Sequence, residues 1–241
     1  MDKQYYITLF DDKRLDLLSK MCRSVKMQGQ HTTVLYNNIT SKLELDIVKE
    51  YGFEELKNLG DTCLKHSQKV LYALNNADNG LVYFSDADDI SFITRTAIQE
   101  KEILKFESVL STASSVIFTN DIYTTMETPR VTPDGIICSY PSTWCFNKKL
   151  LPHIDKIDIL DSENNEWDNI FIMQVLKIGN IISTYDPLSI HNFYDQSTTA
   201  KITDQNNRDI VKKYYQDNKH LFKVFRIILS RLGLVISSPY V

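Results

Sequence analysis

The stretch that most constrains this chain is residues 80–92, where a short apolar run leads directly into a cluster of carboxylates. Residues 81–84 are all apolar, and Asp86, Asp88 and Asp89 follow at once. An unbroken apolar run of this length is typical of a strand buried on both faces, as in the centre of an α/β sheet. Ligands of such sheets collect at the carboxyl ends of the strands, and this strand delivers three carboxylates there.

The crowding of these carboxylates predicts a cation. Carboxylates so close together repel one another unless a cation or water compensates. Hard oxygen ligands of this kind suit Mg²⁺ or Mn²⁺, usually shared with a phosphate group. The alternative is a solvated turn that caps the next helix, and the buried strand before the cluster favours the metal site.

The start of the chain predicts a parallel pair of strands. Residues 5–10 and 32–36 are rich in β-branched and aromatic residues, and apolar residues recur at helical spacing between them. A strand, a helix and a strand in this order predict a right-handed crossover. The polar residues that follow the two strands are Asp11, Asn37 and Asn38. They are expected at the same edge as the acidic cluster, as nucleotide contacts or as turn formers.

The rest of the chain continues the alternation of strands and helices. The sequence predicts helices over residues 43–59 and 61–74, a helix after residue 92, a strand over 115–119, a loop over 123–134, short strands over 136–138 and 143–146, a helix that opens at 166 and stops at Gly179, and a strand over 181–185. The expected fold class is α/β, with a central, mostly parallel sheet flanked by helices.

Composition and charge exclude several classes. The 241 residues are 43% hydrophobic and 24% charged, as in an ordinary globular protein, and can bury a full core. A net charge of −4 does not provide the excess of positive charge that is typical of proteins that bind nucleic acid. Four cysteines without a C-x-x-C pair fit a reducing compartment. With no signal peptide and no apolar span evident, a cytoplasmic location is expected.

The C-terminal residues 201–241 are expected to form an extension to a domain over residues 1–200. A helix is predicted over 209–234, and its second half mixes apolar residues with lysine and arginine. Such a helix can pack on its own domain, pack on a second copy in a homo-oligomer, or lie on an anionic inner membrane face as a peripheral contact. The sequence leaves these three alternatives open.

Over residues 5–200 the pattern resembles the family 2 nucleotide-sugar glycosyltransferases of the GT-A fold. The most specific match is residues 73–89, which are similar to the family's stretch leading into its D-x-D motif. Residues 14–28 look like the family's first helix. Residues 166–168, Glu-Trp-Asp at the head of an apolar helix, look like the family's acidic motif, and His191 resembles its late histidine. The first two strands end differently from the family's, so the nucleotide stays open.

The resemblance implies an inverting, metal-dependent glycosyltransferase of the hexosyltransferase type, active in polysaccharide biosynthesis. Its donor would be a nucleoside-diphosphate sugar, with a UDP-sugar as the first choice, and its acceptor a hydroxyl group of a glycan or glycolipid. Mn²⁺ or Mg²⁺ would bridge the diphosphate and stabilise its departure. A carboxylate must take the proton of the acceptor hydroxyl as that hydroxyl attacks.

Residue roles follow from the same resemblance. Asp88 would coordinate the metal, Asp86 would contact the metal or the ribose, and His191 would be a third ligand or a diphosphate contact. Asp168 would be the catalytic base, with Glu166 as the alternative. The expected nucleoside contacts are Phe10, Asp11, Asn37 and Asn38. Trp144 and Trp167 are candidates for stacking on an acceptor sugar. Trp167 lies beside the start of an apolar helix, where an aromatic residue is more often part of the core. Trp144 is the better candidate, because it follows the proline-containing loop that borders the expected acceptor side.

Two other functions stay in competition. One is a GT-A-like module that binds a nucleotide or glycan without catalysis. The other is a haloacid-dehalogenase-type phosphatase, which also places D-x-D after a buried strand. Phosphatases of that class generally carry the D-x-D motif near the N-terminus, with Thr or Val two residues after its second aspartate. In this chain the residue two positions after Asp88 is Ile90.

Overall fold

The computed structural model describes residues 2–9, 14–60, 65–78, 80–119, 122–127, 130–131, 137–138, 140–150 and 167–193. Its strands are β1 (Lys3–Thr8), β2 (His31–Tyr36), β3 (Glu55–Asn58), β4 (Leu81–Asp86), β5 (Ile90–Ser91), β6 (Leu110–Thr119), β7 (Ile122–Glu127), β8 (Arg130–Val131), β9 (Ile137–Cys138), β10 (Cys145–Asn147) and β11 (Ile181–Phe193). Its helices are α1 (Leu15–Lys26), α2 (Lys42–Glu50), α3 (His66–Asn76), α4 (Arg95–Phe106) and α5 (Trp167–Ile178), with 3₁₀ turns η1 (Pro141–Thr143) and η2 (Lys148–Leu150).

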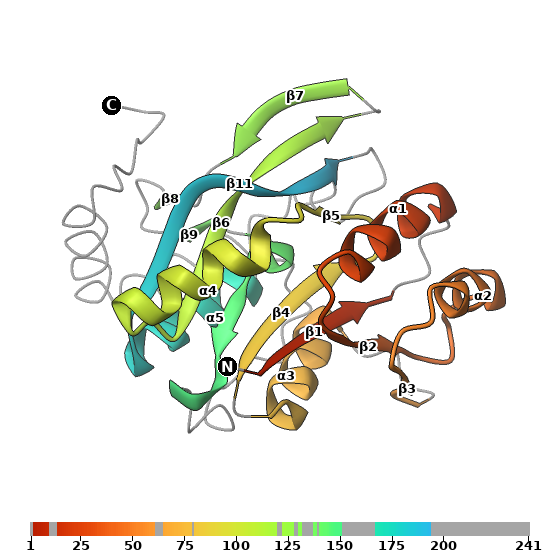
Figure 1. Ribbon diagram of the computed structural model, residues 1–241, viewed down its shortest axis with the longest axis horizontal. Helices are drawn as coiled ribbons and strands as arrows, with labels where there is room; N and C mark the ends of the chain where they lie inside the picture. Colours follow the sequence, from red (N-terminus) through yellow and green to blue (C-terminus); the bar gives the residue numbers. More distant parts are fainter. Residues whose placement is uncertain are drawn as a thin grey trace, which may run out of the picture.

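Among the described residues, nine strands form one sheet in the order β3-β2-β1-β4-β10-β6-β11-β5, with β7 added beside β6 (Figure 1). Strands β3, β2, β1 and β4 are parallel, and β11 is parallel to β6. Strand β10 is antiparallel to both β4 and β6, so β4, β6 and β11 share one direction. The carboxyl ends of β1, β2, β4 and β11 therefore meet at one edge of the sheet, as predicted for the first three.

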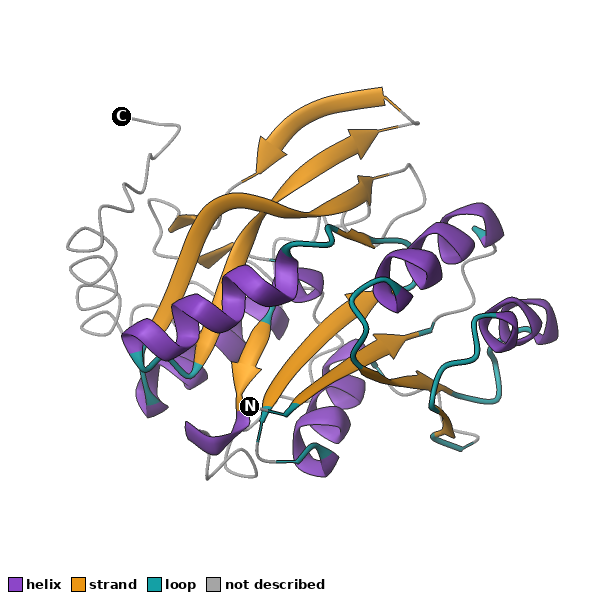
Figure 2. Ribbon diagram, in the orientation of Figure 1, coloured by secondary structure: helices purple, strands orange, loops and turns teal. Residues whose placement is uncertain are grey.

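Helices cover both faces of this sheet (Figure 2). On one face, Tyr5 of β1 and Tyr83 of β4 pack with the apolar sides of α1, α2 and α4. On the other face, Tyr6 and Phe84 pack with α3 and α5. The alternation follows from the pleat, which turns successive side chains of a strand to opposite faces. Residues 81–84 are buried on both faces, which confirms the prediction of a central strand.

Strand β5 is only two residues long, but it sets the geometry of the site. It follows the acidic turn directly and pairs antiparallel with β11, with Ser91 opposite Ser189 and Ile90 opposite Ile190. In an antiparallel ladder one step back along β5 matches one step forward along β11. This register carries His191 toward Asp89, 102 positions earlier in the chain.

Several predicted elements need correction. The helix predicted over 43–59 stops at Glu50, because Gly52 turns the chain with a left-handed φ of 58° and Glu55–Asn58 then pairs with β2 as β3. The loop predicted over 123–134 contains β7, which forms an antiparallel pair with β6. The strand predicted to end at residue 185 continues to Phe193, with register shifts on both sides of Pro187. Residues 201–241 lie outside the described part of the chain.

Candidate functional site

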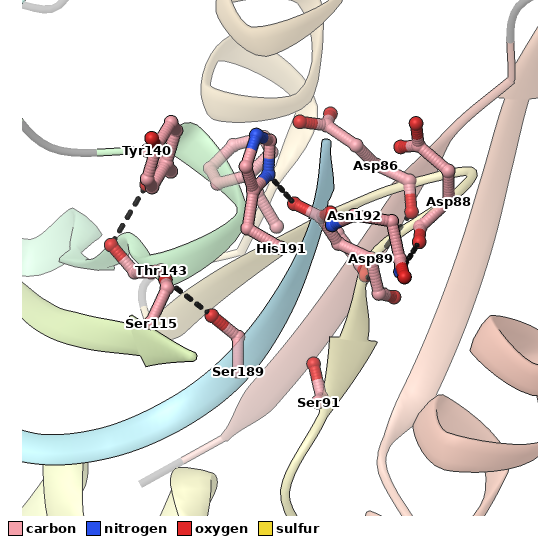
Figure 3. Close-up of polar contacts among 12 residues, drawn as sticks. Asp86, Asp88, Asp89, Ser91, Ser115, Tyr140, Thr143, Ser189, His191 and Asn192 are labelled. Carbon is pink, nitrogen blue, oxygen red and sulfur yellow. Dashed lines mark hydrogen bonds and ion pairs between the residues drawn. The ribbon is translucent and has the colours of Figure 1, made fainter. Parts of the chain in front are cut away.

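The acidic turn joins β4 to β5 at the carboxyl edge of the sheet. The backbone N–H of Asp89 donates to the carbonyl oxygen of Asp86 at 3.3 Å and closes the turn. The side chains of Asp86 and Asp88 are half-buried, whereas Asp89 is buried. Figure 3 shows the Asp86 and Asp88 carboxylates on one side of the turn, while Asp89 reaches back toward His191. The three carboxylates therefore do not share one environment.

Asp89 ties the turn to β11. Its Oδ2 lies 3.0 Å from Nδ1 of His191, and its Oδ1 accepts a hydrogen bond from the backbone N–H of Asn192 at 3.2 Å. The amide of Asn192 donates to the carbonyl oxygen of Asp88, which adds a third link between the same two segments. The turn and the end of β11 are thus held as one unit (Figure 3).

Asp86 is held from the other side by α3 and β1. Nε2 of His66, the first residue of α3, lies 2.9 Å from Oδ1 of Asp86, and Oγ1 of Thr8 donates to the same oxygen at 3.0 Å. The histidine contact lies within ion-pair distance, but its alignment is not that of a good hydrogen bond. Burial acts to raise the pKa of Asp86, but the His66 charge and the Thr8 hydrogen bond outweigh it, and the pKa is lowered. Asp86 is therefore an anion in the folded protein.

His191 is held on a second side by Tyr140. The two rings are stacked, with centroids 3.9 Å apart and planes inclined by 17°. Burial acts to lower the pKa of His191, but Asp89, with Asp88 and Asp86 beyond it, outweighs burial and raises the pKa to about 9. The other ring nitrogen, Nε2, is buried and has no hydrogen-bond partner among the described residues. His191 therefore presents one unsatisfied nitrogen beside a cluster of carboxylates.

The predicted metal ligands are brought to one edge but do not form a complete protein cage. Within the described ranges, no group of three or more His, Cys, Asp or Glu side chains is arranged to hold a metal ion alone. Mg²⁺ usually takes one or two carboxylates and completes its shell with phosphate oxygens and water. Asp86 and Asp88 fit a cation shared with a diphosphate better than a cation held by protein alone. Nε2 of His191 carries a proton below the raised pKa of the ring, so it fits a hydrogen-bond donor to the diphosphate oxygens.

The predicted nucleoside contacts lie at the end of β2, on the same edge. Asn37 is buried, its Oδ1 accepts from Oγ1 of Thr40 at 3.4 Å, and its Nδ2 has no described partner. Asn38 is exposed, and its Oδ1 accepts from Nδ2 of Asn58 at 2.8 Å. The hydrogen bonds of Asn37 and Asn38 to Thr40 and Asn58 fit a role in the turn, and their role as nucleotide contacts stays a prediction. Phe10 and Asp11 lie outside the described residues.

The start of α5 lies beside the acidic turn. The rings of Trp167 and His66 pack in a T-shaped arrangement with centroids 5.1 Å apart, and His66 in turn contacts Asp86. Asp168 is the next residue, in the first turn of α5. The predicted base and the predicted metal ligands are therefore linked through two ring residues. Glu166, the alternative base, lies outside the described residues.

Trp144 is a correction to the predicted acceptor site. Its side chain is fully buried, stacked on Phe171 with centroids 5.4 Å apart, so no face is left for a sugar. Trp167 also packs on this core, but it is only partly buried. The sequence does not show that Phe171 of α5 covers Trp144.

Thr8, His66 and Tyr140 are described residues at the site that were not expected from the sequence. Thr8 and Asp86 are paired across adjacent parallel strands, so the pairing of β1 with β4 would have pointed to the threonine. The other two offered no local signal, because their contacts join residues far apart in the chain.

No protein-family model matches the chain, and no curated protein matches it. Solved structures do match. The structure of S. aureus TarS 1–349 in complex with UDP-GlcNAc aligns with a TM-score of 0.65 at 14% identity, covering 93% of this chain and 71% of that chain. The UDP complex aligns with a TM-score of 0.59 at 16% identity, covering 81% of this chain and 61% of that chain. The chain has a GT-A-type fold.

This likeness confirms the predicted fold class, while membership of family 2 stays a prediction. Against a longer TarS chain the TM-score is 0.59 at 17% identity, and this chain covers only 37% of it. At such identities the GT-A fold is shared, and the substrates of TarS are not thereby transferred. In the part of the chain that the structure describes, no helix has the length and apolar character needed to cross a membrane.

Proposed function

We propose that this chain is a nucleotide-sugar glycosyltransferase that uses a divalent cation and inverts the transferred sugar. The observation that best supports this is the acidic turn at the carboxyl edge of a GT-A-type fold, where Asp86 and Asp88 lie beside His191. In such sheets this edge is where ligands bind. TarS carries UDP-GlcNAc and UDP in its complexes, so UDP-sugars are the first donors to test.

The donor end of the site is negatively charged, which suits a cation-bound diphosphate. Asp86 and Asp88 would hold Mn²⁺ or Mg²⁺ together with phosphate oxygens, and Nε2 of His191 would face the same group. Bound there, the cation would supply positive charge to offset the charge that develops on the leaving diphosphate. Asn37, with its unsatisfied Nδ2, would meet the nucleoside farther along the edge.

The transfer step needs a base on the acceptor side. The acceptor oxygen forms a bond to the anomeric carbon as the bond to the diphosphate oxygen breaks, and that electron pair leaves with the nucleoside diphosphate. The proton of the acceptor hydroxyl passes to the carboxylate of Asp168, with Glu166 as the alternative base. Attack from the face opposite the leaving group inverts the anomeric configuration. A glycan or glycolipid hydroxyl is the acceptor class we propose.

Ligand-dependent thermal stability tests the donor site. UDP, GDP and UDP-GlcNAc are each added with and without MnCl₂ to the wild type, to Asp88→Asn and to a control. The control is Asp46→Asn, which removes an exposed carboxylate on α2. A ligand at 100 times its Kd stabilises the native state by about 2.7 kcal/mol, enough to raise Tm by several degrees.

The expected result is a shift that requires both MnCl₂ and Asp88 and is retained in the control. A shift that needs Asp88 without donor turnover would favour the non-catalytic binding module. No shift with any nucleotide would refute the proposed function.

A further inference from the structure

We propose that Asp89 is a positioning residue that acts through His191. It holds the Nδ1 side of the imidazole so that Nε2 is presented to the diphosphate, and it does not touch the ligand itself. This inference rests on the proposed function and assigns a role to the third carboxylate of the acidic turn.

The first argument is burial. Only 1% of the Asp89 side chain is exposed, whereas the side chain of Asp86 is 19% exposed. A carboxylate at the end of a strand would ordinarily turn to water, and Asp89 instead faces β11. Asp86 and Asp88 are the more exposed carboxylates of the turn, and Asp89 faces the protein interior.

The second argument is the hydrogen-bond pattern. An ionised carboxylate only accepts, and both of its oxygens are used here: Oδ1 by the backbone N–H of Asn192 and Oδ2 by Nδ1 of His191. The ring nitrogen next to Asp89 must therefore carry its proton at Nδ1. This fixes the ring orientation and leaves Nε2, which has no described partner, as the atom available to a ligand. Carboxylates that orient ligand-binding histidines in this way typically change affinity or activity 10–100-fold when mutated.

The third argument is that the ring is also restrained from its face. Tyr140 stacks on His191 at 3.9 Å, and the ladder between β11 and β5 fixes the backbone beside it. With Nδ1, one ring face and the backbone all held, His191 cannot rotate without breaking at least one of these contacts. An imidazole held this way spends no conformational entropy when the ligand binds.

Asp89→Asn tests the assignment because it preserves shape while changing the donor pattern. The amide oxygen can still accept from Asn192, but the amide NH₂ then faces Nδ1 of His191, which cannot accept while it is protonated. In ligand-free protein, ¹H–¹⁵N multiple-bond correlation spectra of labelled histidines report which ring nitrogen carries hydrogen, with His191→Gln identifying the signals. We expect Nδ1–H in the wild type and its loss in Asp89→Asn. A wild-type ring without hydrogen on Nδ1 would overturn the proposal, whether or not any nucleotide binds.

A double-mutant cycle tests the functional consequence, with the Kd of UDP in excess MnCl₂ measured by calorimetry. We expect Asp89→Asn and His191→Gln each to weaken binding about 10–100-fold. The double variant should then be within about twofold of His191→Gln, because Asp89 acts through the histidine. Glu102→Gln, which removes a half-buried carboxylate on α4, is the matched control and should bind like the wild type.

The outcomes separate the two proposals. If the fold-loss of UDP affinity in the double variant equals the product of the two single losses, Asp89 acts on the ligand or the turn directly. That result would overturn the positioning role. A His191→Gln variant that binds UDP as the wild type does would also overturn it. Absence of UDP binding by the wild type would defeat the proposed function, while the histidine spectra would still decide whether Asp89 sets the ring.

Discussion

Nε2 of His66 lies 2.9 Å from Oδ1 of Asp86, and the same imidazole packs in a T-shaped arrangement against the ring of Trp167. One side chain at the start of α3 thus contacts both the acidic turn at the end of β4 and the start of α5. Because Asp168 follows Trp167, His66 bridges the proposed donor and acceptor sides of the site. Its position makes His66 a structural support of the site that motif comparison does not reveal.

Replacing His66 by Gln should lower stability in a pH-dependent way. The pKa of Asp86 is depressed below its ordinary 3.8 in the folded protein, with the His66 charge among the causes. A depressed carboxyl pKa contributes stability that is present above the unfolded value and is lost as pH falls through the folded value. We expect His66→Gln to cost about 1–2 kcal/mol near pH 6, measured by urea unfolding, and progressively less below pH 4.

Asp86→Asn supplies the control for that experiment. In an Asp86→Asn background the effect of His66→Gln should lose its dependence on pH between 3 and 6. An unchanged pH dependence in that background would mean that His66 stabilises the protein through contacts other than Asp86.

Replacing Asp168 by Asn should separate transfer from donor binding. Without the carboxylate the acceptor hydroxyl keeps its proton, and general-base catalysis of this kind contributes about 10²–10⁴-fold. We expect the transfer rate from a UDP-sugar to fall by that factor, while the Kd of UDP with MnCl₂ stays within about twofold of the wild type. If Asp168→Asn transfers normally and Glu166→Gln does not, the base is Glu166.

The features that sequence reasoning predicted are local in the chain. The apolar run of β4 and the carboxylates after it are contiguous, so burial of the strand and placement of the turn followed from one stretch. The parallel pairing of β1 with β2 followed from a strand, a helix and a strand in succession. These signals depend on short-range periodicity, which the sequence displays directly.

The features that it missed depend on contacts between distant residues. His191 meets Asp89 only because β11 continues past Pro187 and pairs with a two-residue strand, and bulges absorb the proline. Trp144 is covered by Phe171, a residue of α5 whose docking the sequence does not show. The end of α2 is different, because its stop signal, Gly52, is local and lies inside the stretch predicted as one helix.

Replacing Trp144 by Ala should affect folding rather than acceptor recognition. The side chain is fully buried and contacts Phe146, Trp167 and Phe171. Truncating a buried aromatic residue of this size typically costs about 3–5 kcal/mol. We expect that loss in urea unfolding, with Trp144→Phe recovering a large part of it and showing a wild-type KM for the acceptor. An acceptor KM that rises in Trp144→Phe without loss of stability would restore the sugar-stacking role.

Replacing Arg95 by Met should destabilise the protein strongly and loosen the acidic turn. Arg95 is fully buried and donates to the carbonyl oxygens of Phe84 and Trp144 and to the hydroxyl groups of Tyr5 and Ser91. Methionine would fill the space but remove these four hydrogen bonds, leaving the Tyr5 and Ser91 hydroxyl groups only their bond to each other and the Trp144 carbonyl only the backbone N–H of Phe84. Since each buried polar group left unsatisfied costs about 1–3 kcal/mol, we expect a loss of at least about 3 kcal/mol in urea unfolding.

Arg95→Lys supplies a comparison for that variant. Lysine keeps the charge but has three donors on one atom, so it cannot reach acceptors spread over β1, β4, β5 and the residue before β10. We expect the free energy of unfolding of Arg95→Lys to lie between those of the wild type and Arg95→Met. A lysine variant as stable as the wild type would show that charge, and not the geometry of the guanidinium, holds these strands.

The pair of His191 and Asp89 should make stability depend on alkaline pH. The pKa of His191 is raised to about 9 from an ordinary 6.5, mainly because Asp89 outweighs the effect of burial. A histidine whose folded pKa is raised contributes stability that is fully present below the unfolded value and is lost as pH rises through the folded value. The window of loss is therefore pH 6.5 to about 9. A shift of this size corresponds to at most about 3 kcal/mol.

That window can be isolated by measuring urea unfolding with EDTA present, so that no cation competes for His191. The free energy of unfolding of the wild type should fall between pH 6.5 and 9 relative to that of His191→Gln, which lacks the titrating group. Asp89→Asn should also lose this slope, because the neutral amide does not favour the imidazolium. If the free energy of unfolding has the same pH dependence in the wild type and in His191→Gln across this window, His191 and Asp89 are not electrostatically coupled. Their 3.0 Å contact would then contribute only as a neutral hydrogen bond.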